Sequence, residues 1–227
     1  MTALPKRQQN RIERERRILD AALQVFSEKG YVGASMDDIA AGAGLTKPTL
    51  YQYFPSKDEL FTAMLTQERD HMLADFEHPS ASGMVAELYA FSWHYAETVL
   101  RPDMLSLARL IISEAHRAPD VGRAYQASGP DRLLAGMISY LNLQKQEGRL
   151  VFDDAELAAE DLWGLILSAP RNRALHIPDA LPDRATIERY IRNGLGVFLR
   201  AYSTRPADDL LALAALKPPT EAQPEHI

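Results

Sequence analysis

The chain has 227 residues, of which 46% are hydrophobic and 25% are charged, and its formal net charge is −6. This composition is typical of a soluble globular protein, and no apolar run approaches the ~18 residues that a membrane-spanning helix needs. The sequence contains no cysteine, which excludes disulfides and thiol chemistry. The N-terminus is basic and polar and lacks the apolar core of a secretory signal. These features predict a cytoplasmic protein of one large or two modest domains.

The charges are unevenly distributed along the chain. Residues 1–17 hold six bases and two acids, and residues 1–60 hold nine bases and eight acids. The remainder holds 16 bases and 23 acids. An acidic body is repelled by nucleic acid, whereas a basic segment is attracted to phosphates. We therefore expect residues 1–10 to form a mobile basic arm that approaches DNA, with a solvated tail as the alternative interpretation.

Three helices are expected in the N-terminal quarter. The first extends from about Arg11 to Lys29 and ends at Gly30. Ser35, followed by Asp38, predicts an N-terminal cap for the second helix. Gly44 ends that helix, because a position just past a helix end often needs a positive φ.

Thr46 begins a third helix, in which Pro48 occupies the first turn, where a missing N–H costs nothing. Leu50 and Phe54 lie four residues apart and turn inward, so the remaining side chains face outward. This pattern predicts a helix-turn-helix; an ordinary pair of core helices is the alternative. Ser56, with Glu59 three residues later, predicts the cap of a fourth helix.

Residues 11–64 resemble the DNA-binding domain of the tetracycline-repressor-like (TetR) family of bacterial regulators. The resemblance is carried by Ile18-Leu19-Asp20-Ala21-Ala22, Phe26, Gly30-Tyr31, Met36-Asp37-Asp38-Ile39-Ala40, Gly44-Leu45-Thr46-Lys47-Pro48-Thr49-Leu50-Tyr51-Gln52-Tyr53-Phe54 and Ser56-Lys57-Asp58-Glu59-Leu60-Phe61. It implies that residues 11–60 form a three-helix DNA-binding domain.

The family pattern at these positions suggests how the contacts to DNA are divided. We expect Lys47 and Gln52 to read base edges, since Lys suits guanine and Gln suits adenine. Pro48 and Thr49 would contact thymine methyl groups, and the other residues would hold phosphates. The expected DNA-binding residues are Ser35, Thr46, Lys47, Pro48, Thr49, Tyr51, Gln52, Tyr53 and Lys57. Asp37 is expected to be solvated and to contribute little, with acceptance from a cytosine amino group as the alternative.

The rest of the chain also reads as helical, which predicts an all-α fold of about nine or ten helices. Further helices are expected over 56–76, from Ser80 or Ser82 to Leu100, and over 103–118, 120–128 and 131–148. Two longer helices follow Asp153-Asp154 and Pro182-Asp183. In the tail, residues 204–227, a short helix over 207–216 should precede a disordered end.

The two long helices have apolar stripes and contain internal glycines, which often permit close helix approach. We expect them to form half of a four-helix interface in a homodimer. The alternative is that they only close the core of one protomer. The expected interface residues are Leu162, Ile166, Tyr190, Ile191, Gly194 and Phe198.

The C-terminal half is similar to the corresponding domain of the AefR-like branch of the family. The similar residues are Arg109-Leu110-Ile111-Ile112-Ser113-Glu114-Ala115-His116-Arg117, Pro119, Tyr125 and Gly129-Pro130. This resemblance implies that residues 61–203 form a helical ligand-binding and dimerisation domain, and the family resemblance implies an apolar pocket among the fifth to eighth helices of the chain. The candidate pocket residues are Trp93, His94, Arg109, Met137 and Trp163, for which a role as core filler is the alternative.

Together these features predict a homodimeric repressor that binds a palindromic DNA operator and is released by a small apolar or amphipathic effector. The alternatives are an activator, or a DNA-binding dimer controlled by a protein partner or by its abundance. An enzyme is not expected, because the six histidines lack metal-ligand spacing and no nucleophile, phosphate or dinucleotide motif occurs. We therefore expect no metal and no cofactor.

Overall fold

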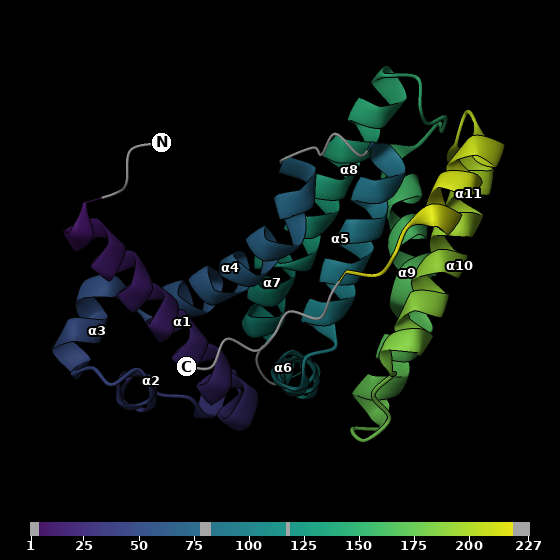
Figure 1. Cartoon of the computed structure of the whole chain (residues 1–227). Helices are drawn as coiled ribbons and strands as arrows, with labels where there is room; N and C mark the ends of the chain where they lie inside the picture. Colours follow the sequence, from purple (N-terminus) through teal and green to yellow (C-terminus); the bar gives the residue numbers. More distant parts are fainter. Residues whose placement is uncertain (1–4, 78–82, 117–118, 220–227) are drawn as a thin grey trace. The chain divides into compact units, whose positions relative to one another are not determined.

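The computed structural model describes residues 5–77, 83–116 and 119–219 (Figure 1). This part of the chain confirms the all-α fold and contains eleven helices, and none of them is long and apolar enough to cross a bilayer. The helices are α1 (Lys6–Gly33), α2 (Met36–Gly42), α3 (Lys47–Tyr53), α4 (Lys57–Glu77), α5 (Met84–Val99), α6 (Pro102–Glu114), α7 (Pro119–Ser128), α8 (Pro130–Gln146), α9 (Ala155–His176), α10 (Arg184–Tyr202) and α11 (Pro206–Ala215).

The chain packs into two compact units. One contains residues up to 70 together with 101–132, and the other contains 71–100 and the residues from 133 onward. Helices α6 and α7 therefore pack with the N-terminal helices. The expected boundary between residues 60 and 61 separates a DNA-binding domain from a ligand-binding and dimerisation domain, and this functional division remains a prediction.

The core of the first unit joins α1, α2, α3 and the start of α4 to α6 and α7. Its largest buried side chains include Phe26 and Phe61, whose rings meet edge to face at 5.2 Å. Tyr31 stacks on Phe26 at 5.7 Å between ring centroids. At the other end of the unit, the Arg101 guanidinium binds both carboxylate oxygens of Glu68, at 3.0 and 3.2 Å. Apolar burial and this forked pair hold α4 and α6 in one body.

Helix α1 differs from its expected bounds at both ends. It begins at Lys6, so residues 6–10 are helical where a mobile arm was expected, and residues 1–4 of that arm lie outside the described part. The helix is interrupted at Gly30, whose φ of 71° lies in the left-handed region. A Cβ at Gly30 would lie 2.3 Å from Glu114 Oε1, so a carboxylate of α6 occupies the space beside this glycine.

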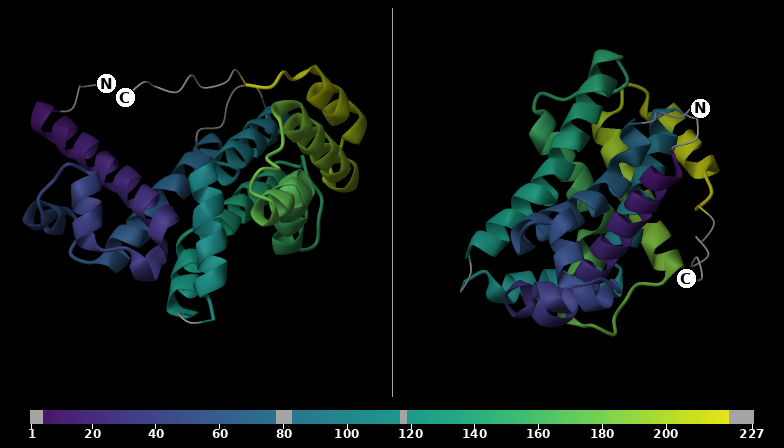
Figure 2. Two further views of the ribbon diagram at one scale, coloured as in Figure 1. Left: turned by 90° about the horizontal axis from the view of Figure 1, so that it is seen from below. Right: turned by 90° about the vertical axis from the view of Figure 1, so that its left-hand side faces the viewer.

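In the second unit, α9 and α10 lie side by side (Figures 1 and 2). At Gly194 the two backbones approach so closely that an added Cβ would lie 2.5 Å from the carbonyl oxygen of Leu165. The expectation for the dimer interface must be corrected here. Five of its six residues are buried within the protomer and so belong to its own core, namely Leu162, Ile166, Ile191, Gly194 and Phe198. Tyr190 alone of the six is partly exposed.

The segment after α10 is fixed to the second unit by arginines. Arg192 donates to the carbonyl oxygens of Leu213 and Leu216 at 2.8 and 2.7 Å, and Arg184 donates to that of Pro219. The short helix expected over 207–216 is present as α11. The expected disorder of the last residues falls mainly on 220–227, which lie outside the described part.

Candidate functional site

The start of α2 is capped as its sequence predicts. The hydroxyl of Ser35 accepts from the Asp38 backbone N–H at 3.2 Å, and the Asp38 carboxylate accepts from the Ser35 backbone N–H at 3.3 Å. Lys29 lies 2.7 Å from the same carboxylate. The hydrogen bond from Lys29 is the main cause that holds the pKa of Asp38 below its usual value, and the Ser35 hydroxyl adds to it. Ser35 is therefore exposed but already engaged in the cap.

The turn between α2 and α3 is fixed by backbone hydrogen bonds. Gly44 has a φ of 66°. Its N–H bonds to the carbonyl of Ala41 at 3.1 Å, and the N–H of Leu45 bonds to that of Ala40 at 2.8 Å. This is the Schellman arrangement, in which a glycine just past the helix satisfies the last carbonyls. It sets the direction in which α3 leaves the turn.

Helix α3 buries one face and exposes the other. Leu50 is fully buried and Phe54 is 6% exposed, so they anchor the helix to the core of the first unit. Thr46 occupies the N-cap position without a capping bond from its side chain. Its hydroxyl instead pairs with that of Thr49 at 2.8 Å. This pair orients both threonines at the start of the helix.

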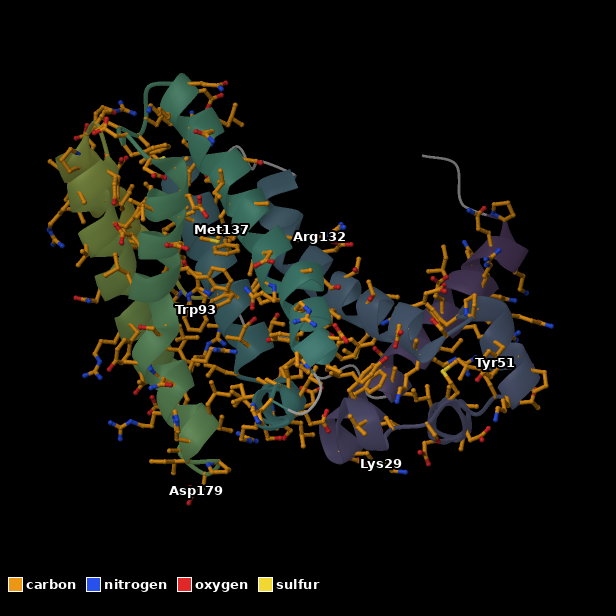
Figure 3. The ribbon with its side chains drawn as sticks, turned by 180° about the vertical axis from the view of Figure 1, so that it is seen from behind. Lys29, Tyr51, Trp93, Arg132, Met137 and Asp179 are labelled. Atoms are coloured by element: carbon orange, nitrogen blue, oxygen red, sulfur yellow. The ribbon has the colours of Figure 1, made fainter. Side chains whose placement is uncertain are left out.

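The outward face of α3 carries most of the residues expected to contact DNA. Thr46, Lys47, Pro48, Tyr51 and Gln52 are exposed, and Figure 3 shows Tyr51 on this helix. Thr49 is half-buried. Tyr53, which was expected to face outward, is also half-buried because its ring packs against the hydrophobic core of the first unit.

Lys47 has an acidic partner on α2. Its Nζ lies 3.0 Å from Asp37 Oδ2, and both side chains are more than half exposed. The hydrogen bond that Lys47 donates to the Asp37 carboxylate raises the pKa of Lys47. Asp37 is therefore not merely solvated, as expected, but forms an ion pair with the Lys47 ammonium.

Lys57 is directed into the first unit and not toward a phosphate. Its Nζ donates to the carbonyl oxygens of Tyr31 and Ala34 at 2.7 and 3.0 Å, and lies 4.5 Å from the centre of the Tyr31 ring. Burial lowers its pKa, although the charge of Glu114 opposes this effect. The expected phosphate contact is thus replaced by a structural role, because these carbonyls at the end of α1 lie within reach of the ammonium.

Sequence reasoning did not select three residues of α1 that adjoin α3. Asn10, Arg11 and Arg14 line an open groove of about 550 Å³ together with Gln52 and Tyr53. The signal that could have identified them is the basic excess of residues 1–17, since four of its six bases (Arg11, Arg14, Arg16 and Arg17) lie in the expected first helix. Their helical placement extends the polar surface of α3 onto α1.

The candidate pocket residues do not form one cluster. Trp93 and Met137 are buried in the second unit at 0% and 1% exposure (Figure 3), and the Arg184 guanidinium lies 4.4 Å over the Trp93 ring. Trp163 is half-buried, and its indole N–H donates to the hydroxyl of Tyr95. These last two aromatic residues, Trp163 and Tyr95, line a groove of about 470 Å³ on α5 and α9.

The two polar candidates lie elsewhere. His94 is exposed on α5, and Arg109 belongs to the first unit, where it donates to Ser106 at 3.1 Å. A buried polar pair that sequence reasoning missed joins α5 to α8: the Tyr140 hydroxyl donates to Glu87 at 2.6 Å. Burial, followed by the bond to Glu87, raises the pKa of Tyr140 far above its usual value.

Two family models match the chain. The model of bacterial regulatory proteins of the tetR family matches residues 18–64. The model of the C-terminal domain of AefR-like transcriptional repressors matches residues 86–204, which is more than half of the chain.

Solved structures and a curated relative agree with these matches. A TetR-family transcriptional regulator from Mesorhizobium loti MAFF303099 is 30% identical, with 85% of this chain and 98% of that chain covered and a TM-score of 0.71. The flavonoid-responsive regulator FrrA is 31% identical over 85% and 98% of the two chains, with a TM-score of 0.63. The transcriptional activator FasR from Mycolicibacterium smegmatis is 45% identical over 71 residues, which span 30% of this chain and 32% of FasR. The match thus covers about a third of that curated relative.

All of these relatives regulate transcription. The family matches cover both the helix-turn-helix and most of the helices that follow it. The chain therefore belongs to the TetR family of bacterial transcriptional regulators, with a C-terminal domain of the AefR-like type, and is not an enzyme.

Proposed function

We propose that the protein is a homodimeric repressor that binds a palindromic operator through α3 and releases it when a small effector binds. The observation that carries the DNA-binding part is the outward face of α3. Lys47, Tyr51 and Gln52 are exposed there, while Leu50 and Phe54 anchor the helix. A short helix that is buried on one face and exposed on the other is suited to enter a major groove.

The side chains of α3 would divide the work of recognition. Lys47 and Gln52 would read guanine and adenine edges, and Pro48 and Thr49 would contact thymine methyl groups. Thr46, Tyr51 and the rim of Tyr53 would hold phosphates, which fixes the position of the helix without reading sequence. Ser35 would lie near the groove, while its hydroxyl stays engaged in the α2 cap.

A homodimer would place two copies of α3 in successive major grooves, about 34–36 Å apart. The dimer would use the outer faces of α9 and α10, since their inner faces are buried against each other. Leu157 and Val197 support this assignment, because they are apolar and yet 58% and 40% exposed. An isologous contact of this kind requires a symmetric operator.

The effector would bind in the second unit and contact its aromatic side chains. Trp93 and Met137 offer apolar surface, and the buried Glu87–Tyr140 pair offers a polar contact for a hydroxyl group. The responsiveness of FrrA to flavonoids supports a flat, aromatic effector for this chain. Binding would tilt α4 and change the separation of the two α3 helices, which lowers operator affinity.

Selection of bound fragments from the source genome, with and without small-molecule extracts, tests the whole proposal. The expected result is a palindromic site whose enrichment falls in the presence of an effector. Loss of preference at one base pair in Gln52→Ala would identify the base that this residue reads, whereas unchanged preference would remove Gln52 from base recognition.

Two alternatives have specific support. FasR is named as an activator, so the position of the selected sites relative to promoters decides between repression and activation. If no extract changes operator binding while the dimer and the palindrome are present, the protein is controlled by a partner protein or by its abundance.

A further inference from the structure

The outer face of α9 carries matching residues on either side of Ile166. Gly164 and Ser168 lie two positions before and after it, and Glu160 and Arg171 lie six before and five after it. Two leucines, Leu157 and Leu175, lie nine positions before and after it. On both sides of Ile166, a small residue therefore comes first, then a charged residue and then a leucine, and the two charged residues have opposite signs.

These residues share one side of the helix. At 3.6 residues per turn, Leu157, Gly164, Ser168 and Leu175 form one strip, and Glu160 and Arg171 both lie on the same flank of that strip. The buried residues Ala158, Leu162 and Ile166 project from the opposite side. The groove of about 470 Å³ runs along the charged flank and is lined by Glu160, Gly164, Ser168 and Arg171, among others.

Packing within the protomer does not account for the glycine in this strip. A Cβ at Gly164 would meet no atom within 4 Å in the described part of the chain. Gly194 differs, because an added Cβ there would collide with the backbone of α9. A glycine inside a helix lowers its stability relative to alanine. The space beside Gly164 is therefore free on the outer face of α9, where a second helix would be able to approach closely.

Among the residues that the structure describes, the charged side chains beside the strip also lack partners. Arg171 is half-buried, and its Nε is buried without a hydrogen bond among the described residues. Within that same part of the chain, the side chains of Arg171 and Glu160 form no ion pair and no hydrogen bond. A half-buried guanidinium without an acceptor is costly, so a carboxylate supplied from outside would stabilise it.

We propose that α9 packs antiparallel on α9 of a second copy, around a twofold axis that crosses the outer strip at the level of Ile166, between Gly164 and Ser168. This rests on the proposed homodimer and specifies its register. The axis places Glu160 opposite Arg171 of the partner subunit and Gly164 opposite Ser168 of the partner subunit. The exposed Leu157 then packs on Leu175 of the partner subunit, so that apolar contacts close both ends of the strip.

Because the axis is twofold, each contact between the two α9 helices occurs twice, once on each side of the axis. Two charge pairs form at the flank, and small side chains at the centre let the helix axes come close. A parallel arrangement of the two helices would instead place Glu160 opposite Glu160 of the partner subunit, which is repulsive. The charges therefore select the antiparallel register.

Charge reversal in mixed dimers tests this register. As homodimers, Glu160→Lys and Arg171→Glu each place like charges opposite each other at two points, so we expect each to raise the dimer dissociation constant by about tenfold or more. In heterodimers of the two variants, both pairs again unite opposite charges, so the dissociation constant should fall back toward the wild-type value, to within about threefold. Sedimentation velocity and native mass spectrometry measure both quantities.

Arg173→Glu provides the matched control, since Arg173 is exposed on the same helix but lies outside the strip. It should dimerise as wild type does and should not rescue Glu160→Lys. If the charge variants lose their fold, cysteine cross-linking in the natural charge background replaces them, because the chain has no cysteine. A mixture of Gly164→Cys and Ser168→Cys should form disulfide-linked heterodimers.

The outcomes separate the register from the dimer itself. A wild-type dimer whose reversed variants are not rescued by mixing, or whose cysteine variants do not cross-link, overturns the α9 register and leaves the homodimer intact. A wild-type chain that stays monomeric overturns the homodimer of the proposed function.

Discussion

Lys47 combines a predicted role in reading DNA with a contact to an acid that opposes binding. Its ammonium lies 3.0 Å from the Asp37 carboxylate, and both groups are exposed. We expect Asp37→Asn to strengthen binding to operator and unrelated duplexes alike, by roughly two- to tenfold at low salt, because a negative charge near the phosphates is removed and Lys47 is released. Fluorescence anisotropy with both duplexes over a salt series measures this effect. Weaker binding of the operator alone would instead indicate that Asp37 accepts from a cytosine amino group.

Lys57 illustrates the opposite case, a base near the DNA-binding helices whose ammonium is used inside the protein. We expect Lys57→Ala to lower the free energy of unfolding by about 1–2 kcal/mol, since it removes two charge-assisted hydrogen bonds to main-chain carbonyls. The slope of log affinity against log salt should remain unchanged. Lys47→Ala is the control: removal of this exposed cation from the DNA-binding face should reduce that slope, with little loss of stability. A flattened slope in Lys57→Ala would restore the phosphate contact.

Individual helices were predictable wherever a local cap defines them. Ser35 with Asp38, the turn at Gly44 and the cap before α4 follow from short-range geometry, and the structure places a helix end at each. The partners of buried faces were not predictable. The stripe of Leu162 and Ile166 has the same spacing whether it meets α10 of its own chain or a second copy.

Long-range contacts explain the other differences. The direction of Lys57 depends on carbonyls 23 and 26 residues away in sequence. The packing of α6 against α1 likewise cannot be predicted from a local sequence pattern, and neither can the position of the Glu114 carboxylate beside Gly30. Sequence patterns therefore predicted the helices and most of the exposed surface of α3. Which helices pack into one core, and which partners Lys57 and Glu114 contact, could be learned only from the folded structure.

The α2 cap should make stability depend on pH. The pKa of Asp38 is lowered in the folded state, chiefly by Lys29. Its ionised form therefore stabilises the fold above the unfolded value of about 3.8, and this stabilisation is lost as the pH falls through the folded pKa. We expect Asp38→Asn to be less stable than wild type at pH 7, with a difference that shrinks below pH ~4. Urea unfolding of both proteins at several pH values measures it, and a constant difference would exclude the charge as the cause.

The crossing of α9 and α10 depends on one glycine. We expect Gly194→Ala to cost about 1–3 kcal/mol, because its Cβ would meet backbone atoms of Leu165 that cannot move without separating the helices. Thermal or urea unfolding measures the loss. Gly122→Ala on α7 is the control, since its Cβ would meet only Ala115 Cβ at 3.9 Å and should leave stability equal or slightly higher. Equal effects of the two substitutions would show that the close approach is not limiting.

Charge and helix packing are unevenly distributed over the whole molecule. The basic excess lies in residues 1–17, next to α3 along the groove that Arg11 and Arg14 line, whereas the residues after 60 are acidic. The body that carries α3 also includes α6 and α7. An effector in the second unit would therefore have to displace a larger body than the three-helix domain that the sequence resemblance marks.

A symmetric dimer makes DNA binding depend on the spacing of the two half-sites. Once the operator is known, we expect insertion of five base pairs between its halves to reduce affinity by at least tenfold, because half a helical turn rotates one half-site to the opposite side of the duplex. Insertion of ten base pairs restores the side but adds about 34 Å, so only part of the affinity should return. Electrophoretic mobility shifts of the three duplexes measure this. Equal affinity for all three would mean that each α3 binds independently, so that no rigid dimer links the two half-sites.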